Sequence, residues 1–195
     1  MRDFSGKSII LASNSPRRKE LLCGLGFDFT IDTLNTFEES KEPDREPEMV
    51  PVDMSIGKSH GFHRELEQNE ILITADTVVI LGREVLGKPH SREEAMDMLG
   101  KLSGHSHNVV TSVTLRDSRH EKTFSVSTEV VFDVLSKEDI EWYVDKFSPY
   151  DKAGAYGIQE WIGYIGIKEI RGSYYNVMGL PVNRLWHELS LFVED

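Results

Sequence analysis

Apolar runs with the alternation of strands divide the chain into regular segments. The run at 8–12 (SIILA) has the apolar character of a buried strand, and residues 124–135 place Thr128, Val130, Phe132 and Val134 at every second position. Gly82 and Arg83 interrupt a long apolar stretch as a turn does. The pattern predicts strands at 8–12, 27–34, 70–89 (two strands around the Gly82–Arg83 turn), 107–116 and 124–135.

Helical periodicity fills the intervals between these strands. The clearest helix covers 91–104, where Ser91 and Glu94 form a capping box and four apolar residues repeat at helical spacing. Ser15 is a good N-cap, and Pro16 suits the first helical position. The pattern predicts helices from Ser15 to Gly24 or Gly26, over 52–67 with Asp53 as a candidate cap, and over 91–104, 136–147 and 181–192. Strands and helices that alternate in this way indicate an α/β fold.

Length and composition are those of one ordinary globular domain. The chain has 195 residues, of which 39% are hydrophobic and 28% are charged. No apolar run approaches a membrane span, and the N-terminus becomes polar too early for a signal peptide. The single cysteine, Cys23, cannot form an internal disulfide, so we expect a cytoplasmic protein with Cys23 in its core.

The net charge of −11 limits the classes of partner. A protein this acidic repels nucleic-acid polymers and anionic membranes. If it binds an anion, local cations must do so. Arg17, Arg18 and Lys19 are unfavourable beside the positive end of a helix dipole unless an anion lies there. They either form an anion site or point to solvent and pair with acids such as Glu20.

Asp76 stands inside the apolar run ILITADTVVIL. A carboxylate is costly in such a strand when it is buried and unpaired. We expect it at the strand's end, where it binds a metal or takes a proton; a structural role in a turn is the alternative. Lys58 lies on a predicted helix, and Lys88 lies between Gly87 and Pro89; both either contact a ligand or are solvated.

Other familiar sites are missing from the sequence. The histidine pairs His60/His63 and His105/His107 have no companion ligand at zinc-like spacing, so we interpret them as surface residues. The glycines near 154–163 do not follow a strand as GxGxxG, and there is neither a GxSxG elbow nor a Walker A loop.

Four long stretches together resemble the Maf family of nucleoside triphosphate pyrophosphatases. They read LASNSPRRKELL, ADTVVILGREVLGKP, LSGHSHNVVTSVTL and DKAGAYGIQE…GSYYNVMGLP, and the resemblance runs from about Ile9 to Leu189. It implies an elongated α/β fold with a twisted mixed sheet flanked by helices. Two lobes would enclose a cleft, similar to inosine triphosphate pyrophosphatases. It also implies a single Maf-like domain over 1–195 and a homodimer.

The activity that the resemblance implies is hydrolysis between the α- and β-phosphates of a nucleoside triphosphate. The products are a monophosphate and pyrophosphate, and the cofactor is a divalent metal, Mg²⁺ or Mn²⁺. The biological role would be the cleaning of the nucleotide pool. Two alternatives stay open: an enzyme for purine or modified nucleotides such as 7-methyl-GTP, and a regulator of septum formation and cell division.

The resemblance also assigns site residues. Asp76 falls on the catalytic position, as general base or holder of a metal and its water. Either Glu38 or Glu39, with Glu38 preferred, supplies a further carboxylate for the metal. Residues that match the family's phosphate-binding positions are Ser13, Arg17, Arg18, Lys58 and Lys88.

Three positions resemble the branch of the family that acts on dTTP and UTP: Arg17, Thr77 and Gln159. A glutamine amide offers one donor and one acceptor, which suits the O4 and N3–H edge of uracil or thymine. Trp161 follows closely, and we expect its ring to narrow the base pocket.

Overall fold

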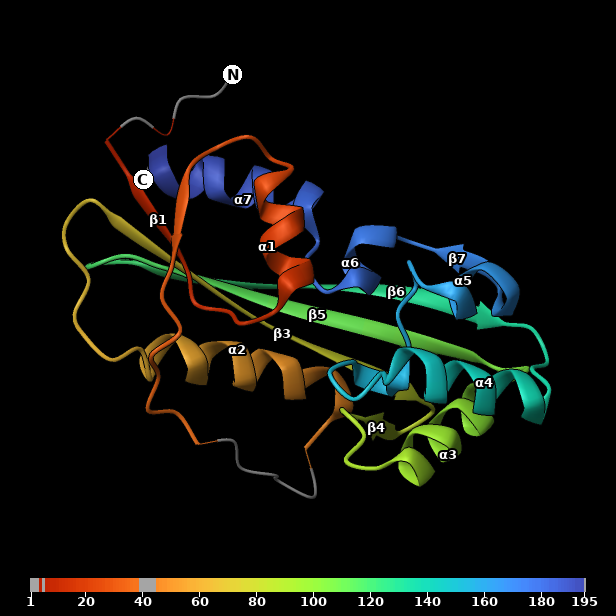
Figure 1. Cartoon of the computed structure of the whole chain (residues 1–195). Coiled ribbons are helices and arrows are strands. Elements are labelled where there is room, and N and C mark those ends of the chain that lie inside the picture. The colour runs from red at the N-terminus through yellow and green to blue at the C-terminus, as the bar shows by residue number, and fades with distance from the viewer. Residues whose placement is uncertain (1–3, 5, 39–44, 195) are drawn as a thin grey trace. The chain divides into compact units, whose positions relative to one another are not determined.

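The computed structural model describes residue 4 and residues 6–38 and 45–194 (Figure 1). Its strands are β1 Ser8–Leu11, β2 Phe29–Ile31, β3 Glu70–Leu81, β4 Glu84–Leu86, β5 Ser106–Arg116, β6 Glu121–Phe132 and β7 Ile167–Arg171. Its α-helices are α1 Pro16–Cys23, α2 Val50–His60, α3 Arg92–Leu102, α4 Lys137–Phe147, α5 Trp161–Gly166, α6 Tyr174–Met178 and α7 Val182–Glu194. Two short 3₁₀ helices are η1 Pro47–Met49 and η2 Ala153–Ala155.

The strands form one mixed sheet, as predicted. Its order is β2-β1-β3-β5-β6-β7, and β4 pairs with β3 beside this path. Strand β1 is parallel to both β2 and β3, whereas β4 and β7 run antiparallel to their neighbours. The fold is therefore α/β with a mixed sheet and flanking helices, which confirms the fold class.

The chain packs as two compact units. The first comprises 1–76, 111–126 and 179–195, and the second comprises 77–110 and 127–178. In the first unit, α1 and α7 lie on one side of the sheet and α2 on the other (Figure 1). In the second unit, α3 packs against α4 and η2.

Local capping explains why most helices begin where the sequence predicts. The side chains of Ser15, Ser91 and Ser136 each accept a hydrogen bond from the backbone N–H three residues later, at the starts of α1, α3 and α4. The predicted apolar stripe of α3 is fully covered by protein: Ala95, Met98, Leu99 and Leu102 are all buried.

Several sequence-based expectations were wrong. Helix α2 begins at Val50 and ends at His60, so Asp53 lies in its first turn and does not cap it. Cys23 is exposed at the last position of α1, although the preceding Leu21 and Leu22 are buried. Val134 lies beyond the end of β6 and is 80% exposed. The short elements α5, β7 and α6 were not predicted within the glycine-rich segment.

Candidate active site

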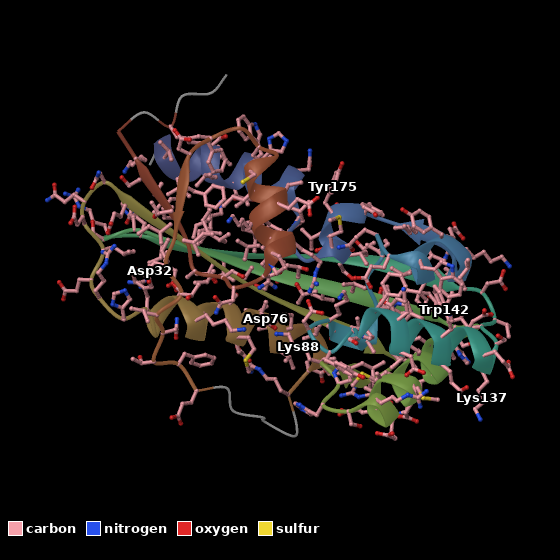
Figure 2. All side chains as sticks on the ribbon, viewed as in Figure 1. Asp32, Asp76, Lys88, Lys137, Trp142 and Tyr175 are labelled. Carbon is pink, nitrogen blue, oxygen red and sulfur yellow. The ribbon has the colours of Figure 1, made fainter. Side chains whose placement is uncertain are left out.

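Asp76 and Lys58 form an ion pair in the first unit. Lys58 Nζ lies 2.6 Å from Asp76 Oδ1, and the two side chains are 26% and 18% exposed. Lys58 comes from the last turn of α2, and Asp76 comes from β3, which runs beside that helix (Figures 1 and 2). The apolar strand therefore carries a charged carboxylate because a helix places an ammonium group against it.

The strand position of Asp76 differs from the prediction. Asp76 lies in the middle of the twelve-residue strand β3, not at its end. The neighbouring strand β1 ends its pairing earlier, with Leu11 opposite Ile73. Asp76 is three residues beyond that last pair, so the end of β1, and not the end of β3, leaves the carboxylate partly accessible.

A network of hydroxyl groups fixes α2 against the sheet. Thr74 Oγ1 donates to the carbonyl oxygen of Ser55 at 2.7 Å, and Thr74 is two residues from Asp76 on the same face of β3. The Ser55 hydroxyl lies 3.0 Å from the hydroxyls of both Ser112 and Thr114 on β5. These residues are fully buried. Their hydrogen bonds fix the position of α2 along the sheet at Ser55, about one turn before Lys58.

Arg18 has a structural partner at each end of its guanidinium group. Its Nε donates to the carbonyl oxygen of Gly179 at 2.8 Å, and its Nη1 donates to that of Ala75 at 2.9 Å. Burial lowers the pKa of Arg18. The negative charge of Asp76 raises this pKa, and the positive charge of Arg17 lowers it further. Arg18 thus links α1 to the residue before Asp76 and to the segment before α7.

Ser13 belongs to the turn that begins α1. Its hydroxyl accepts a hydrogen bond from the backbone N–H of Ser15 at 3.2 Å, and Ser15 in turn caps Arg18 N. Arg17 is half-buried next to Arg18 and is close enough to influence the pKa of that residue. The first unit therefore gathers Arg17, Arg18, Lys58 and Asp76 at the beginning of α1 and the end of α2.

The candidate metal ligands are only partly described. Glu38 is exposed, and it follows Phe37, whose ring packs against Gly57 in α2; Glu39 lies outside the described residues. Among the residues that the structure describes, no three His, Cys, Asp or Glu side chains gather as a metal site. Mg²⁺ commonly takes one or two protein carboxylates and completes its shell with phosphate and water, and Asp76 fits that mode.

Lys88 and Thr77 belong to the second unit. Lys88 is exposed, and the carbonyl oxygen of the preceding Gly87 accepts a hydrogen bond from Gly154 N at 3.0 Å. The backbone beside Lys88 is thus fixed by η2, with Pro89 buried after it. Thr77 follows Asp76 on β3 and is half-buried. Because successive side chains of a strand point to opposite faces, we expect the Thr77 side chain on the face opposite that of Asp76.

Gln159 carries an unusual amide in the second unit. Within the described part of the chain, its Oε1 is buried and has no hydrogen-bond partner. A buried oxygen of this kind normally accepts a hydrogen bond from protein, water or a ligand. The nearby Trp161 packs against another aromatic ring: its ring lies 4.5 Å, centroid to centroid, from that of Trp142 on α4.

The sequence reasoning missed three polar residues around Gln159. Tyr143 is fully buried on α4, Glu160 follows Gln159, and Lys152 is 9% exposed and 3.1 Å from Glu160 Oε1. One signal was present in the sequence, because Lys152 directly precedes the small residues Ala153, Gly154 and Ala155.

The histidines are divided between surface and core. His60 and His63 form hydrogen bonds with Glu121 and Asp32 at 2.7 and 2.9 Å. His107 was predicted on the surface and is instead 2% exposed, with Nε2 2.7 Å from the Tyr156 hydroxyl. Burial lowers the pKa of His107 to about 4, because the charged imidazolium loses its hydration.

Comparison with known proteins defines the class of fold first. The Ham1 protein of Staphylococcus aureus superposes with a TM-score of 0.50 over 93% of this chain and 100% of its own, at 18% identity. The two proteins therefore share an α/β fold. No helix among the described residues is long and apolar enough to cross a membrane.

Sequence comparison then gives the family. The profile described as "Maf-like protein" matches residues 8–192, so this chain belongs to the Maf family. It is 53% identical over 182 residues to a dTTP/UTP pyrophosphatase of Bacteroides thetaiotaomicron, covering 93% of this chain and 94% of the relative. Proteins of the same name from Parabacteroides distasonis and Porphyromonas gingivalis are each 47% identical, and at least 94% of each chain is covered.

Proposed function

We propose that this protein hydrolyses dTTP and UTP to the monophosphate and pyrophosphate, and so removes these nucleotides from the pool. The observation that carries the proposal is the Lys58–Asp76 ion pair. It holds a carboxylate and an ammonium group side by side, one to accept a proton and the other to bind phosphate oxygen. The names of the relatives support the pyrimidine branch over the 7-methyl-GTP branch.

The reaction adds water across the phosphoanhydride between the α- and β-phosphates. Asp76 accepts a proton from the attacking water as the water oxygen bonds to the α-phosphorus, and the bond from that phosphorus to the bridging oxygen breaks, with the bridging oxygen leaving as part of pyrophosphate. Lys58 and Arg17 bind phosphate oxygens and neutralise their charge, while Arg18 positions the start of α1. Phosphoryl transfer depends mainly on positioning and electrostatics, so no covalent nucleophile is needed.

We propose Mg²⁺ or Mn²⁺ as the cofactor, held by Asp76 with the phosphates of the substrate and with Glu38 or Glu39 as a further ligand. When bound, such a metal neutralises phosphate charge and lowers the pKa of a coordinated water. Lys88 is proposed as another phosphate ligand, and Thr77 and Gln159 as determinants of the base.

The remaining expectations are also proposals: a single Maf-like domain, a homodimer and a cytoplasmic location. Light scattering during size-exclusion chromatography tests the dimer.

The activity is tested by measuring pyrophosphate release from dTTP, UTP, CTP, ITP and 7-methyl-GTP with Mg²⁺ or Mn²⁺. Release from dTTP and UTP above all others is expected; preference for a purine nucleotide would contradict the proposal.

A further inference from the structure

A closed turn carries Gln159. The backbone N–H of Glu160 donates to the carbonyl oxygen of Gly157 at 3.0 Å, so residues 157–160 form a four-residue turn with Gln159 in its third position. The Glu160 side chain contacts two other residues of the second unit. Its Oε2 accepts a hydrogen bond from the Tyr143 hydroxyl, and its Oε1 lies 3.1 Å from Lys152 Nζ.

Tyr143 contacts both ends of the turn. Its hydroxyl oxygen accepts a hydrogen bond from the backbone N–H of Gly157 at 3.0 Å while its proton goes to Glu160. The ring is fully buried, so the hydroxyl cannot turn to solvent. Burial, and then the hydrogen bond to Glu160, raise the pKa of Tyr143, which keeps the phenol protonated as a donor.

Close packing leaves the turn little freedom. A Cβ atom at Gly157 would lie 2.8 Å from Glu160 Cδ and 3.0 Å from Lys152 Cε. On the other side, a Cβ atom at Gly163 in α5 would lie 1.9 Å from the carbonyl oxygen of Ile158. The backbone on both sides of Gln159 is therefore held between α4, Lys152 and α5.

The amide of Gln159 needs such support if it is to discriminate between bases. Uracil and thymine present O4 as acceptor and N3–H as donor, whereas cytosine presents an amino group and an acceptor N3. A glutamine amide that can turn by 180° exchanges its own donor and acceptor and fits either pattern. Selectivity therefore requires one fixed orientation, with the buried and unpartnered Oε1 as the acceptor.

We propose that Tyr143, Glu160 and Lys152 are positioning residues for base specificity, which hold Gln159 with its Oε1 toward the N3–H of uracil or thymine. This inference rests on the proposed function. A ligand base that supplies the missing N–H satisfies the buried oxygen, and one that presents an acceptor there leaves it unsatisfied and repelled. The positioning residues act on selectivity through Gln159 and need no contact with the nucleotide.

The test compares kcat/KM for UTP and CTP in Tyr143→Phe and Glu160→Gln, with melting curves on the same samples. Tyr143→Phe removes only the hydroxyl. The UTP/CTP ratio is expected to fall about 3- to 10-fold, a part of the effect of losing a whole amide contact to a base. Tyr175→Phe is the matched control, because Tyr175 is 50% exposed on α6 (Figure 2), and its ratio should not change.

A double variant separates positioning from general damage. When Gln159→Ala is already present, adding Tyr143→Phe should leave the UTP/CTP ratio unchanged, since the two residues act as one unit. Equal losses on UTP and CTP in Tyr143→Phe, or an unchanged ratio in both single variants, would overturn the inference while the proposed function stands. A parent protein that does not prefer UTP to CTP would overturn both.

Discussion

Lys58 Nζ and Asp76 Oδ1 lie 2.6 Å apart and join α2 to β3. The contact explains how an apolar strand accommodates a carboxylate in its middle. It also places the Lys58 ammonium group beside the carboxylate that we propose as the general base. Thr74 and Ser55 fix the register of the helix on the strand, and this register determines which helix residue meets Asp76.

Replacement of Lys58 by methionine should mainly reduce activity. The variant keeps most of the unbranched side chain but loses the terminal ammonium group, with its charge and its hydrogen bond to Asp76. We expect kcat/KM for UTP to fall about 10- to 100-fold, as for the loss of a charged hydrogen bond worth about 1.5–3 kcal/mol. Lys101→Met is the control, since Lys101 pairs with Glu84 and Asp97 on the surface. Steady-state kinetics on both variants measure the effect. A loss of kcat/KM below twofold in Lys58→Met would contradict the role of Lys58.

Replacement of Arg18 by lysine should mainly reduce stability. One ammonium group cannot reach the carbonyl oxygens of both Gly179 and Ala75, so at least one loses its partner. The expected loss is about 1.5–3 kcal/mol, which lowers Tm by about 3–12 °C in a chain of this size. Lys19→Ala, an exposed change in the same turn, should leave Tm within about 2 °C. Equal melting temperatures for Arg18→Lys and Lys19→Ala would show that Arg18 does not link these segments.

Two helical glycines should respond to alanine in opposite directions. A Cβ atom at Gly100 in α3 meets nothing within 4 Å, so Gly100→Ala should stabilise the protein by about 0.5–1 kcal/mol. A Cβ atom at Gly163 would lie 1.9 Å from a backbone oxygen, so Gly163→Ala must displace the 157–160 turn or α5. Thermal melting should rise for the first variant and fall for the second. A Gly163→Ala protein as stable as the parent would contradict the close packing of that turn.

Buried His107 should make stability depend on pH. Its pKa is about 4 in the folded protein, below the ordinary value of 6.5. The unfolded chain therefore binds more protons between these values, so stability is lost as pH falls from about 6.5 to 4, by at most about 3 kcal/mol. His107→Gln keeps a polar partner for Tyr156 but does not titrate. Melting between pH 7 and 4.5 should show a smaller decrease of Tm for this variant; parallel decreases would exclude His107 as the cause.

Local signals in the sequence predicted most of the fold. Ser15, Ser91 and Ser136 cap helices because the hydroxyl and its N–H partner are only three residues apart. The antiparallel pairing of β3 with β4 depends on a two-residue turn and was found for the same reason. Asp76 and Arg18 could be selected as unusual, since each conflicts with its own local environment.

Features that depend on distant segments were not predictable from the pattern. The partners of Arg18 are 57 and 161 residues away, so the sequence could not distinguish an anion ligand from a structural link. The sequence showed no partner for His107, so the residue was assigned to the surface. In the structure Tyr156, 49 residues away, forms its hydrogen bond inside the core. The short α5, β7 and α6 lie in a glycine-rich segment, and each is too short to show a hydrophobic repeat in the sequence.

The most direct test of the account is pyrophosphate release from dTTP and UTP by Asp76→Asn beside the parent. Asparagine keeps the shape of the side chain and removes its basicity, so turnover should fall at least about 10²-fold. Because Lys58 is partly exposed and can turn to solvent, Tm should fall by no more than a few degrees. Asp53→Asn, which breaks the exposed pair with Arg45, is the control and should keep full activity. A folded Asp76→Asn protein with near-normal turnover on dTTP and UTP would contradict the account.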